Sequence, residues 1–150
     1  MIVIGIDPGA HDFAWARYDT DRNEITGWNM VPIDDRTAEK NVLCWPRNYD
    51  NMAIEDVRLY QNMAKSGRVR QVLLETAKTI GRLQQHFPEA ILIPRKTICA
   101  ALGVGVTAGN AQVNRALGNL IPTFKAVRGG LNSHHRAAAA VAYASVGRFK

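Results

Sequence analysis

The chain is 150 residues long with a formal net charge of +6, a length that predicts one domain (residues 1–150) with a core of its own. No apolar run is long enough to span a bilayer and no leader precedes the first strand, so we expect a cytoplasmic protein without a membrane partner. The two cysteines, Cys44 and Cys99, lack metal-finger spacing, and both are expected to be reduced.

Charge is divided unevenly along the chain. Residues 1–56 hold eleven of the thirteen acids and five of the nineteen bases, a net charge of −6. Residues 57–150 hold fourteen bases and two acids, a net charge of +12. A surface so poor in acids favours a polyanionic partner, nucleic acid before an anionic membrane. No segment pairs a broad apolar face with a lysine-rich one, which disfavours the membrane. A basic protein without such a partner stays an alternative.

The first part of the chain is predicted to be mostly β-structure. Apolar, β-branched runs predict four strands, over residues 2–7, 12–18, 24–32 and 52–55. The almost unbroken run Ile2–Ile6 indicates a first strand that is buried on both faces. The Pro8–Gly9 turn that follows predicts a hairpin into the second strand.

Helices and strands alternate in the second part. A long helix is predicted from Ser66 to His86, closed by Pro88, and residues 90–94 predict a fifth, buried strand. The helical spacing is carried by Val69, Val72, Leu73, Ala77, Ile80, Leu83 and Phe87. Three further helices are predicted over residues 96–102, 110–120 and 132–146. This order of elements indicates an α/β fold with a mixed sheet.

Two carboxylates stand at strand ends, Asp7 on the first strand and Glu55 on the fourth. A lone carboxylate is costly to bury unless a metal, a donor or a ligand compensates it. If the two strands are neighbours, the acids lie side by side and need a cation between them to stay ionised. Such oxygen ligands suit Mg²⁺ or Mn²⁺, and two ions about 3.5–4 Å apart are a standard device for cutting phosphodiesters. Each acid alone is also compatible with an ordinary strand-end carboxylate.

Four segments, in this order, resemble the RuvC-type Holliday-junction resolvases. They are Gly5-Ile-Asp-Pro-Gly9, Ile54-Glu55-Asp56-Val57, Val106-Thr107-Ala-Gly109 with Ala111-Gln112-Val113, and Ser133-His134-His135-Arg136 before an alanine-rich run. The resemblance covers nearly the whole chain; the first segment is common among ribonuclease-H-like proteins, whereas the four together are fairly specific. The short length and the divergent residues 34–50 are more similar to a phage-type or otherwise compact member, in a bacterial cell, than to a housekeeping bacterial one.

The resemblance implies a ribonuclease-H-like fold, a mixed five-stranded sheet flanked by helices. It implies an endonuclease that binds four-way DNA junctions and cuts symmetric strands with two Mg²⁺ ions per active site, for which Mn²⁺ substitutes. No small-molecule cofactor is implied, and the glycine-rich residues 103–109 lack the ending of a nucleotide-binding loop. Symmetric cutting implies a homodimer, for which helix 66–86 is the candidate interface. An actin-like ATPase needs two such domains, which 150 residues cannot supply.

Position by position, the resemblance implies that Asp7 and Glu55 are metal ligands. His134 matches the first of two further ligands on the last helix, and the second, an aspartate in the family, falls on Ala137. An (i, i+3) spacing puts positions 134 and 137 on one helical face, but a methyl group cannot bind metal. The catalytic set is therefore expected to be Asp7, Glu55, His134 and the incomplete position Ala137.

Three explanations for Ala137 stay open. The chain carries an inactivating change from aspartate to alanine; it is a natural, non-catalytic relative that binds branched DNA; or another side chain, such as Asp12 or Asp56, completes the site. In the first two cases cleavage is expected to be slow and junction binding to survive.

DNA contacts are predicted from charge and from the resemblance. In the family the segment after Glu55 enters the junction, often led by an aromatic, and Tyr60 is the nearest one here, although its offset differs; a half-buried tyrosine is the alternative. Each basic candidate is otherwise a solvated charge, and the amides before Asn110 are placed to bind a phosphate. The full set is Arg58, Tyr60, Lys65, Arg68, Arg95, Lys96, Thr107, Asn110, Arg115 and Arg128.

Overall fold

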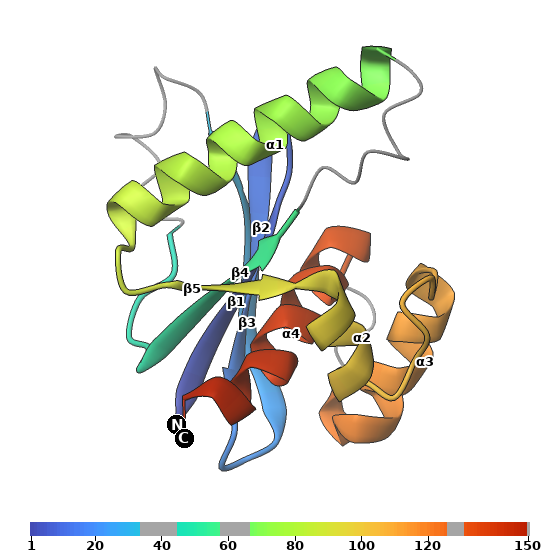
Figure 1. The fold of residues 1–150 in the computed structure, drawn as a ribbon. Coiled ribbons are helices and arrows are strands. Elements are labelled where there is room, and N and C mark those ends of the chain that lie inside the picture. The colour runs from blue at the N-terminus through green and yellow to red at the C-terminus, as the bar shows by residue number, and fades with distance from the viewer. Residues whose placement is uncertain (34–44, 58–66, 126–130, 150) are drawn as a thin grey trace.

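A five-stranded mixed sheet forms the centre of the protein (Figure 1). The structure, a computed structural model, describes residues 1–33, 45–57, 67–125 and 131–149. The strand order is β3-β2-β1-β4-β5; β3, β2 and β1 pair antiparallel, while β1, β4 and β5 pair parallel. The strands are β1 (Ile2–Pro8), β2 (Asp12–Asp19), β3 (Glu24–Pro32), β4 (Asn51–Asp56) and β5 (Ile91–Pro94). The predicted α/β fold is confirmed.

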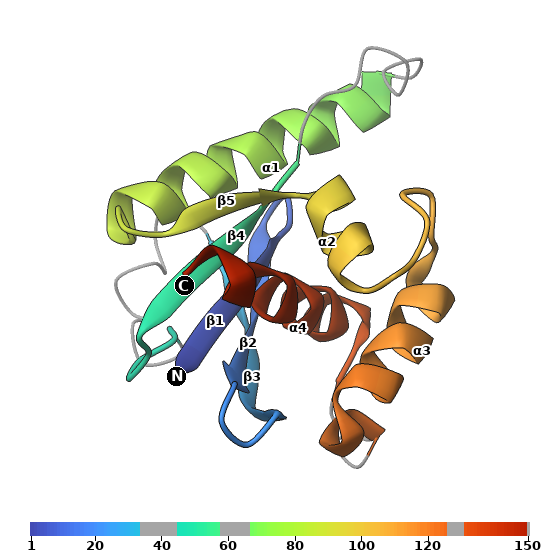
Figure 2. The ribbon, with the colours of Figure 1, turned by 60° about the horizontal axis from the view of Figure 1, so that its bottom comes forward.

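Helices cover both faces of this sheet (Figures 1 and 2). One face carries α1 (Gly67–His86), and the other carries α4 (Ser133–Ser145). Beside α4 lie α2 (Arg95–Ala101) and α3 (Asn110–Leu120). The short 3-10 helix η3 (Pro122–Lys125) follows α3, and a second, η4 (Val146–Arg148), follows α4. Among the described residues, no helix has both the length and the apolar character that a membrane span requires.

The central strand β1 is buried on both faces, as predicted. Val3, Ile4 and Ile6 have no exposed surface, because successive side chains enter opposite cores. Val3 belongs to the core under α4, whereas Ile4 and Ile6 belong to the core under α1. This alternation places Asp7 on the α4 side of the sheet. The predicted hairpin is also present, with Pro8 paired to Phe13 across β1 and β2.

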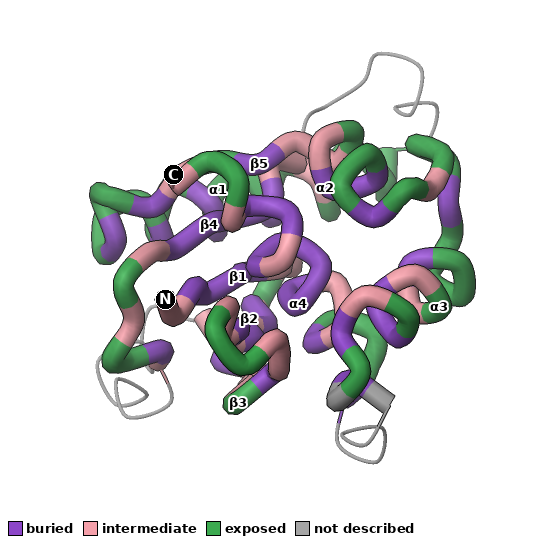
Figure 3. Tube along the Cα trace, turned by 90° about the horizontal axis from the view of Figure 1, so that it is seen from below, coloured by how far each residue is buried: buried purple, intermediate pink, exposed green. Residues whose placement is uncertain are grey.

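The last helix lies directly on β1 because both surfaces are made of small residues. Ala138, Ala139, Ala140 and Ala142 of α4 are fully buried, and Figure 3 shows the helix as mostly buried along its length. At Gly5 the backbone of α4 comes so close that a Cβ atom would overlap the carbonyl oxygen of Ala138 and the amide of Ala142. The alanine-rich stretch is thus the packing surface that brings the start of α4 to the end of β1.

One prediction about burial is wrong. The fifth strand is not buried throughout: Ile93 is 2 % exposed but Leu92 is 37 % exposed, because β5 is an edge strand. In α1 the predicted helix is present, and of the apolar residues at helical spacing Ile80 and Leu83 are buried while Val72 is 48 % exposed. The reason is that the N-terminal part of α1 extends beyond the sheet (Figures 1 and 2).

The predicted bounds of the strands and helices agree with the structure to within two residues at each end. Cys99 is buried and free of any disulfide, as expected, whereas Cys44 lies outside the described residues.

Candidate active site

Asp7 and Glu55 lie on neighbouring parallel strands at the same edge of the sheet. Ile6 of β1 pairs with Ile54 of β4, so the next positions along both strands are Asp7 and Glu55. Adjacent strands are about 4.8 Å apart, which places the two carboxylates side by side. Both acids project towards α4, because Ile6 and Ile54 project into the opposite core. The predicted pairing of the two acids is therefore present.

The start of α4 brings His134 to Asp7. The Asn132 side chain accepts a hydrogen bond of 2.9 Å from the amide of His135, which caps the helix at a fixed residue. His134, one turn before the buried alanines, then lies with Nδ1 2.8 Å from Oδ2 of Asp7. The hydrogen bond joins residues from opposite ends of the sequence. The side chain of His134 is 57 % exposed and that of Asp7 is 16 % exposed, so the imidazole lies nearer the surface than the carboxylate to which it is bonded.

Arg95 supplies a positive charge to Glu55. β5 pairs with β4 so that Ile93 is opposite Glu55, and Arg95 follows as the first residue of α2. Its Nη1 lies 3.6 Å from Oε1 of Glu55, and its Nη2 donates a hydrogen bond of 3.4 Å to the carbonyl of Ala108. Arg95 was predicted only as a DNA contact, and this ion pair was not foreseen from the sequence. A basic residue directly after the strand next to β4 was the sequence signal that could have predicted this ion pair.

Burial governs the protonation of both acids. Burial and, to a smaller extent, the nearby charge of Asp7 raise the pKa of Glu55 to about 7 against the opposing effect of Arg95. Burial also raises the pKa of Asp7, against the opposing effects of His134 and Arg95. Two buried carboxyl groups that resist joint ionisation favour a cation or a proton between them. Perturbed pairs of this kind in a hollow are typical of functional sites.

The two acids open into a hollow of about 290 Å³. Its lining residues are Asp7, Pro8, Glu55, Val57, Arg95, Asn110, Ser133, His134 and Ala137. All four positions of the predicted catalytic set therefore face one space, and Ala137 is the member without a donor atom. In the described part of the chain, no group of three or more histidine, cysteine or acidic side chains is arranged to hold a metal ion.

Neither candidate replacement for the missing ligand completes the set within the residues that the structure describes. Asp56 follows Glu55 directly on β4, so its side chain projects to the opposite face of the sheet. Asp12 begins β2, and its charge raises the pKa of Asp7 without forming a ligand group.

The predicted DNA contacts fall into three sets. Arg95 and Asn110 line the active-site hollow. Arg68, Lys96 and Thr107 are exposed, and Arg115 lines a separate pocket between α3 and α4. Arg58, Tyr60, Lys65 and Arg128 lie outside the described residues. The DNA-binding role of all of them stays a prediction.

Three solved structures, two of one protein and one of another, share this architecture over nearly the whole chain. RuvC of Thermus thermophilus in complex with a Holliday junction substrate has a TM-score of 0.65 and 14 % identity, with 99 % of this chain and 96 % of that chain covered. The fold is that of the RuvC-type resolvases. RuvC from the same organism in a second structure has a TM-score of 0.63 and 13 % identity over 99 % and 96 % of the two chains. The Fowlpox virus resolvase, in complex with its substrate Holliday junction DNA, has a TM-score of 0.53 and 13 % identity over 99 % of both chains.

At these identities the similarity establishes the fold, and the predicted ribonuclease-H-like architecture is confirmed. No family model matches the sequence, and no curated protein matches it.

Proposed function

We propose that this chain is a RuvC-type protein that binds four-way DNA junctions and carries an endonuclease centre lacking one metal ligand. The observation that carries the proposal is the convergence of Asp7, Glu55, His134 and Ala137 on one hollow of a RuvC-type fold. The structures with this fold include two resolvases in complex with Holliday junctions. The basic second half of the chain supports a polyanionic partner.

The donor set fits one hard divalent cation but not two. Asp7 and Glu55 are neighbouring carboxylates with raised pKa values, and such oxygen donors suit Mg²⁺ or Mn²⁺. They would hold the ion in competition with Arg95 and with the hydrogen bond from His134. A second ion lacks its ligand at Ala137. When bound, such ions activate water and stabilise the leaving oxygen of a phosphodiester.

Residues of the chain itself account for binding and positioning. Arg95 balances the charge of Glu55 from within the fold, so the site keeps its shape without a ligand. The start of α3 at Asn110 borders the hollow, where backbone amides favour a phosphate oxygen. His134 orients Asp7 towards the hollow. We therefore expect DNA to be held at this edge while cleavage is slow.

A non-catalytic junction-binding protein is the second candidate function. Ala137 favours it directly, because the methyl group faces the hollow at the position expected to carry a ligand.

The homodimer is proposed to form through the exposed half of α1. Val69 and Val72 continue, at helical spacing, the stripe that Ile80 and Leu83 bury against the sheet. They are 39 % and 48 % exposed, and the part of α1 that carries them extends beyond the sheet (Figure 2). A second copy of this helix would cover the two valines and relate two active sites by a twofold axis.

Restoring the carboxylate tests the proposed function. We expect Ala137→Asp to cut a synthetic four-way junction about 100-fold faster or more than the present chain in Mg²⁺ or Mn²⁺, because the reacting groups become positioned. Ala137→Asn is the matched control, since it has the same size without the charge. The double variant Asp7→Asn, Ala137→Asp is expected to be inactive. Cleavage is measured on gels, and binding by fluorescence anisotropy.

The two assays separate the alternatives. An Ala137→Asp variant that binds the junction but stays inert would contradict the endonuclease centre and leave the non-catalytic function. Failure of the present chain to bind four-way junctions in preference to duplex would contradict both.

A further inference from the structure

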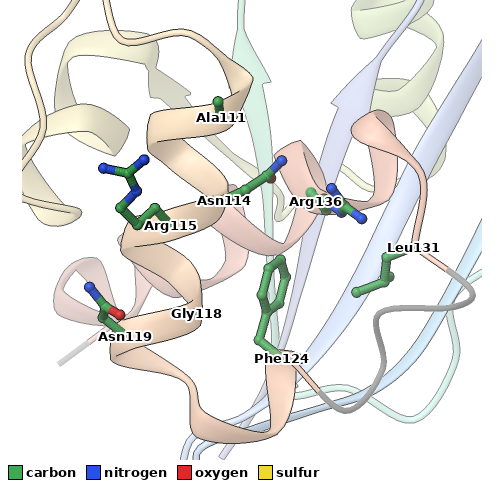
Figure 4. Close-up of a pocket in the computed structure, with 8 residues that line it drawn as sticks. All are labelled: Ala111, Asn114, Arg115, Gly118, Asn119, Phe124, Leu131 and Arg136. Carbon is green, nitrogen blue, oxygen red and sulfur yellow. The ribbon is translucent and has the colours of Figure 1, made fainter.

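A second pocket, of about 390 Å³, lies between α3 and α4 beside the candidate active site (Figure 4). We call it the α3–α4 pocket. Its lining residues are Ala111, Asn114, Arg115, Gly118, Asn119, Phe124, Leu131 and Arg136. It begins one residue from the active-site hollow on both helices, because Asn110 and Ala137 line that hollow while Ala111 and Arg136 line this pocket. Its volume lies in the range of about 300–1,000 Å³ that is typical of small-molecule sites.

The pocket has an apolar floor and polar walls. Phe124 and Leu131 are 6 % and 5 % exposed, so their side chains are part of the core. Figure 4 shows Asn114 extending from α3 towards Arg136 of α4, above the ring of Phe124. Within the described residues, the side chains of Asn114, Arg115 and Arg136 have no hydrogen-bonding or ionic partner.

The charge around this pocket is uncompensated by the local sequence. Residues 90–150, which supply all of α2, α3 and α4, contain eight lysines and arginines and no acid. Guanidinium groups without a carboxylate partner favour phosphate, which they bind through paired N–H donors. The pocket therefore favours an anionic ligand.

The remaining lining distinguishes a nucleotide from a bare phosphate. A phosphate contact needs neither a buried apolar floor nor an amide side chain. A nucleobase uses both, because its ring packs on apolar surface and its edge pairs with the donor and acceptor of an asparagine. An asparagine can also pair with the major-groove edge of a base-paired adenine, but a base whose ring face packs on apolar side chains has left the duplex stack, so the lining suits a nucleotide outside a duplex.

We propose that the α3–α4 pocket holds one unpaired nucleotide of the DNA strand that passes the active site. Arg136 binds the phosphate, and Asn114 pairs with the base above Phe124 and Leu131. The proposal rests on the proposed function, since the strand reaches the pocket from the adjoining hollow. Along α3 the distance from Asn110 to Asn114 is roughly 6 Å, so a strand at the hollow passes the pocket entrance. The pocket would then select branched DNA with unpaired nucleotides over continuous duplex.

The experiment compares two DNA probes of equal length and charge. One is a four-way junction with two unpaired thymidines at its centre, and the other is a fully paired linear duplex. Asn114→Ala removes the amide, and Ala111→Trp narrows the pocket from an exposed rim position without changing charge. Both are expected to weaken junction binding at least fivefold and to leave duplex binding within twofold. Arg136→Gln is expected to weaken the junction more than the duplex.

Arg148→Gln is the matched control, because it removes an exposed arginine from the same acid-free segment at the other end of α4. It is expected to change the affinity for both probes by the same factor, below twofold. Binding of thymidine 5′-monophosphate, followed by NMR, gives a second measure, and its loss in Asn114→Ala is expected while inorganic phosphate binding is retained.

Two results would overturn the inference. Equal losses on both probes in Arg136→Gln, with Asn114→Ala and Ala111→Trp unaffected, would reduce the pocket to a phosphate contact. Loss of mononucleotide binding without any loss on the junction would make it a site for free nucleotides. If the present chain binds no junction, the proposed function is contradicted. If it also binds no thymidine 5′-monophosphate, the pocket as a nucleotide site is contradicted too.

Discussion

Burial and two charged neighbours set the protonation of the Glu55 carboxyl group. Burial and the charge of Asp7 disfavour ionisation, and the guanidinium of Arg95 at 3.6 Å compensates only part of that effect. The result is a pKa of about 7, so near neutral pH the group is poised between its two forms. A divalent cation between the two acids would replace the proton that the folded protein otherwise takes up.

This shift predicts how stability depends on pH. The folded-state pKa of Glu55 lies above the value of 4.5 for a free glutamate, so the folded protein binds the proton more tightly than the unfolded chain. The stabilisation is complete below about pH 4.5 and is lost as the pH rises through 7. The full effect corresponds to about 3 kcal/mol in the free energy of unfolding. Glu55→Gln is expected to be more stable than the present chain at pH 8 by up to about this amount.

Urea unfolding between pH 5 and pH 8, with a chelator present, measures the effect. Glu75→Gln is the control, because this acid lies on α1, away from the site, in a surface pair with Lys78. The same pH slope in Glu55→Gln and in the present chain would contradict the assignment. Adding Mg²⁺ at pH 8 should stabilise the present chain and leave Glu55→Gln unchanged.

At the scale of elements, the site depends on how closely α4 approaches β1. Gly5 and the alanines of α4 remove side-chain bulk from both surfaces, and the backbones meet. The residues of the site follow at fixed offsets, with Asp7 two positions after Gly5 and His134 four positions before Ala138. The same packing that stabilises the core therefore fixes the distance between Asp7 and His134.

A methyl group at Gly5 tests this packing. Gly5→Ala is expected to lower the free energy of unfolding by about 3 kcal/mol, since the overlapping atoms belong to the backbone of α4 and cannot rotate away. Gly27→Ala is the matched control in β3, where a Cβ would meet only side-chain atoms, of Trp15 and Arg17, at 3.6 Å or more. That variant should change stability by less than about 1 kcal/mol. Equal effects of the two changes in thermal or urea unfolding would contradict the close approach.

At the scale of the whole molecule, the helices on the two faces of the sheet differ in exposed apolar surface more than in charge. The described acids of residues 1–56 lie on the strands of the sheet or in the turns and bends beside them, while α2, α3 and α4 come from a segment without acids. α2, α3 and α4 carry four bases and no acid and lie on one side of the sheet, next to the active-site edge, whereas α1, with four bases and one acid, lies on the other side (Figure 2). Because α1 is basic as well, its exposed Val69 and Val72, and not its charge, favour it for protein contacts.

The proposed dimer follows from the exposed stripe on α1. Val72→Glu is expected to weaken dimerisation at least tenfold, because a charge would be buried against the partner helix. Leu74→Glu is the matched control: Val72 and Leu74 are each 48 % exposed, but Leu74 lies on the opposite side of the helix. Light scattering over a concentration series measures the dissociation. Identical behaviour of the two variants, or a monomeric present chain, would contradict this interface.

The sequence by itself determined the elements and most of the candidate catalytic positions. Strand alternation, helical spacing, the proline after α1 and the cap at Asn132 are encoded by residues a few positions apart, so their bounds were predictable. For the same reason Ala137 could be placed one turn after His134 without a structure.

Only the tertiary structure decided which of these elements meet. The pairing of β1 with β4, which puts Asp7 beside Glu55, joins residues 48 positions apart in the sequence. The ion pair of Arg95 with Glu55, the half-covered stripe of α1 and the α3–α4 pocket are likewise contacts between distant segments. Periodicity shows which face of an element is apolar, but the partner of that face depends on packing across the whole chain. The function proposed for this protein therefore rests on residues that the sequence identified and on neighbours that the fold supplied.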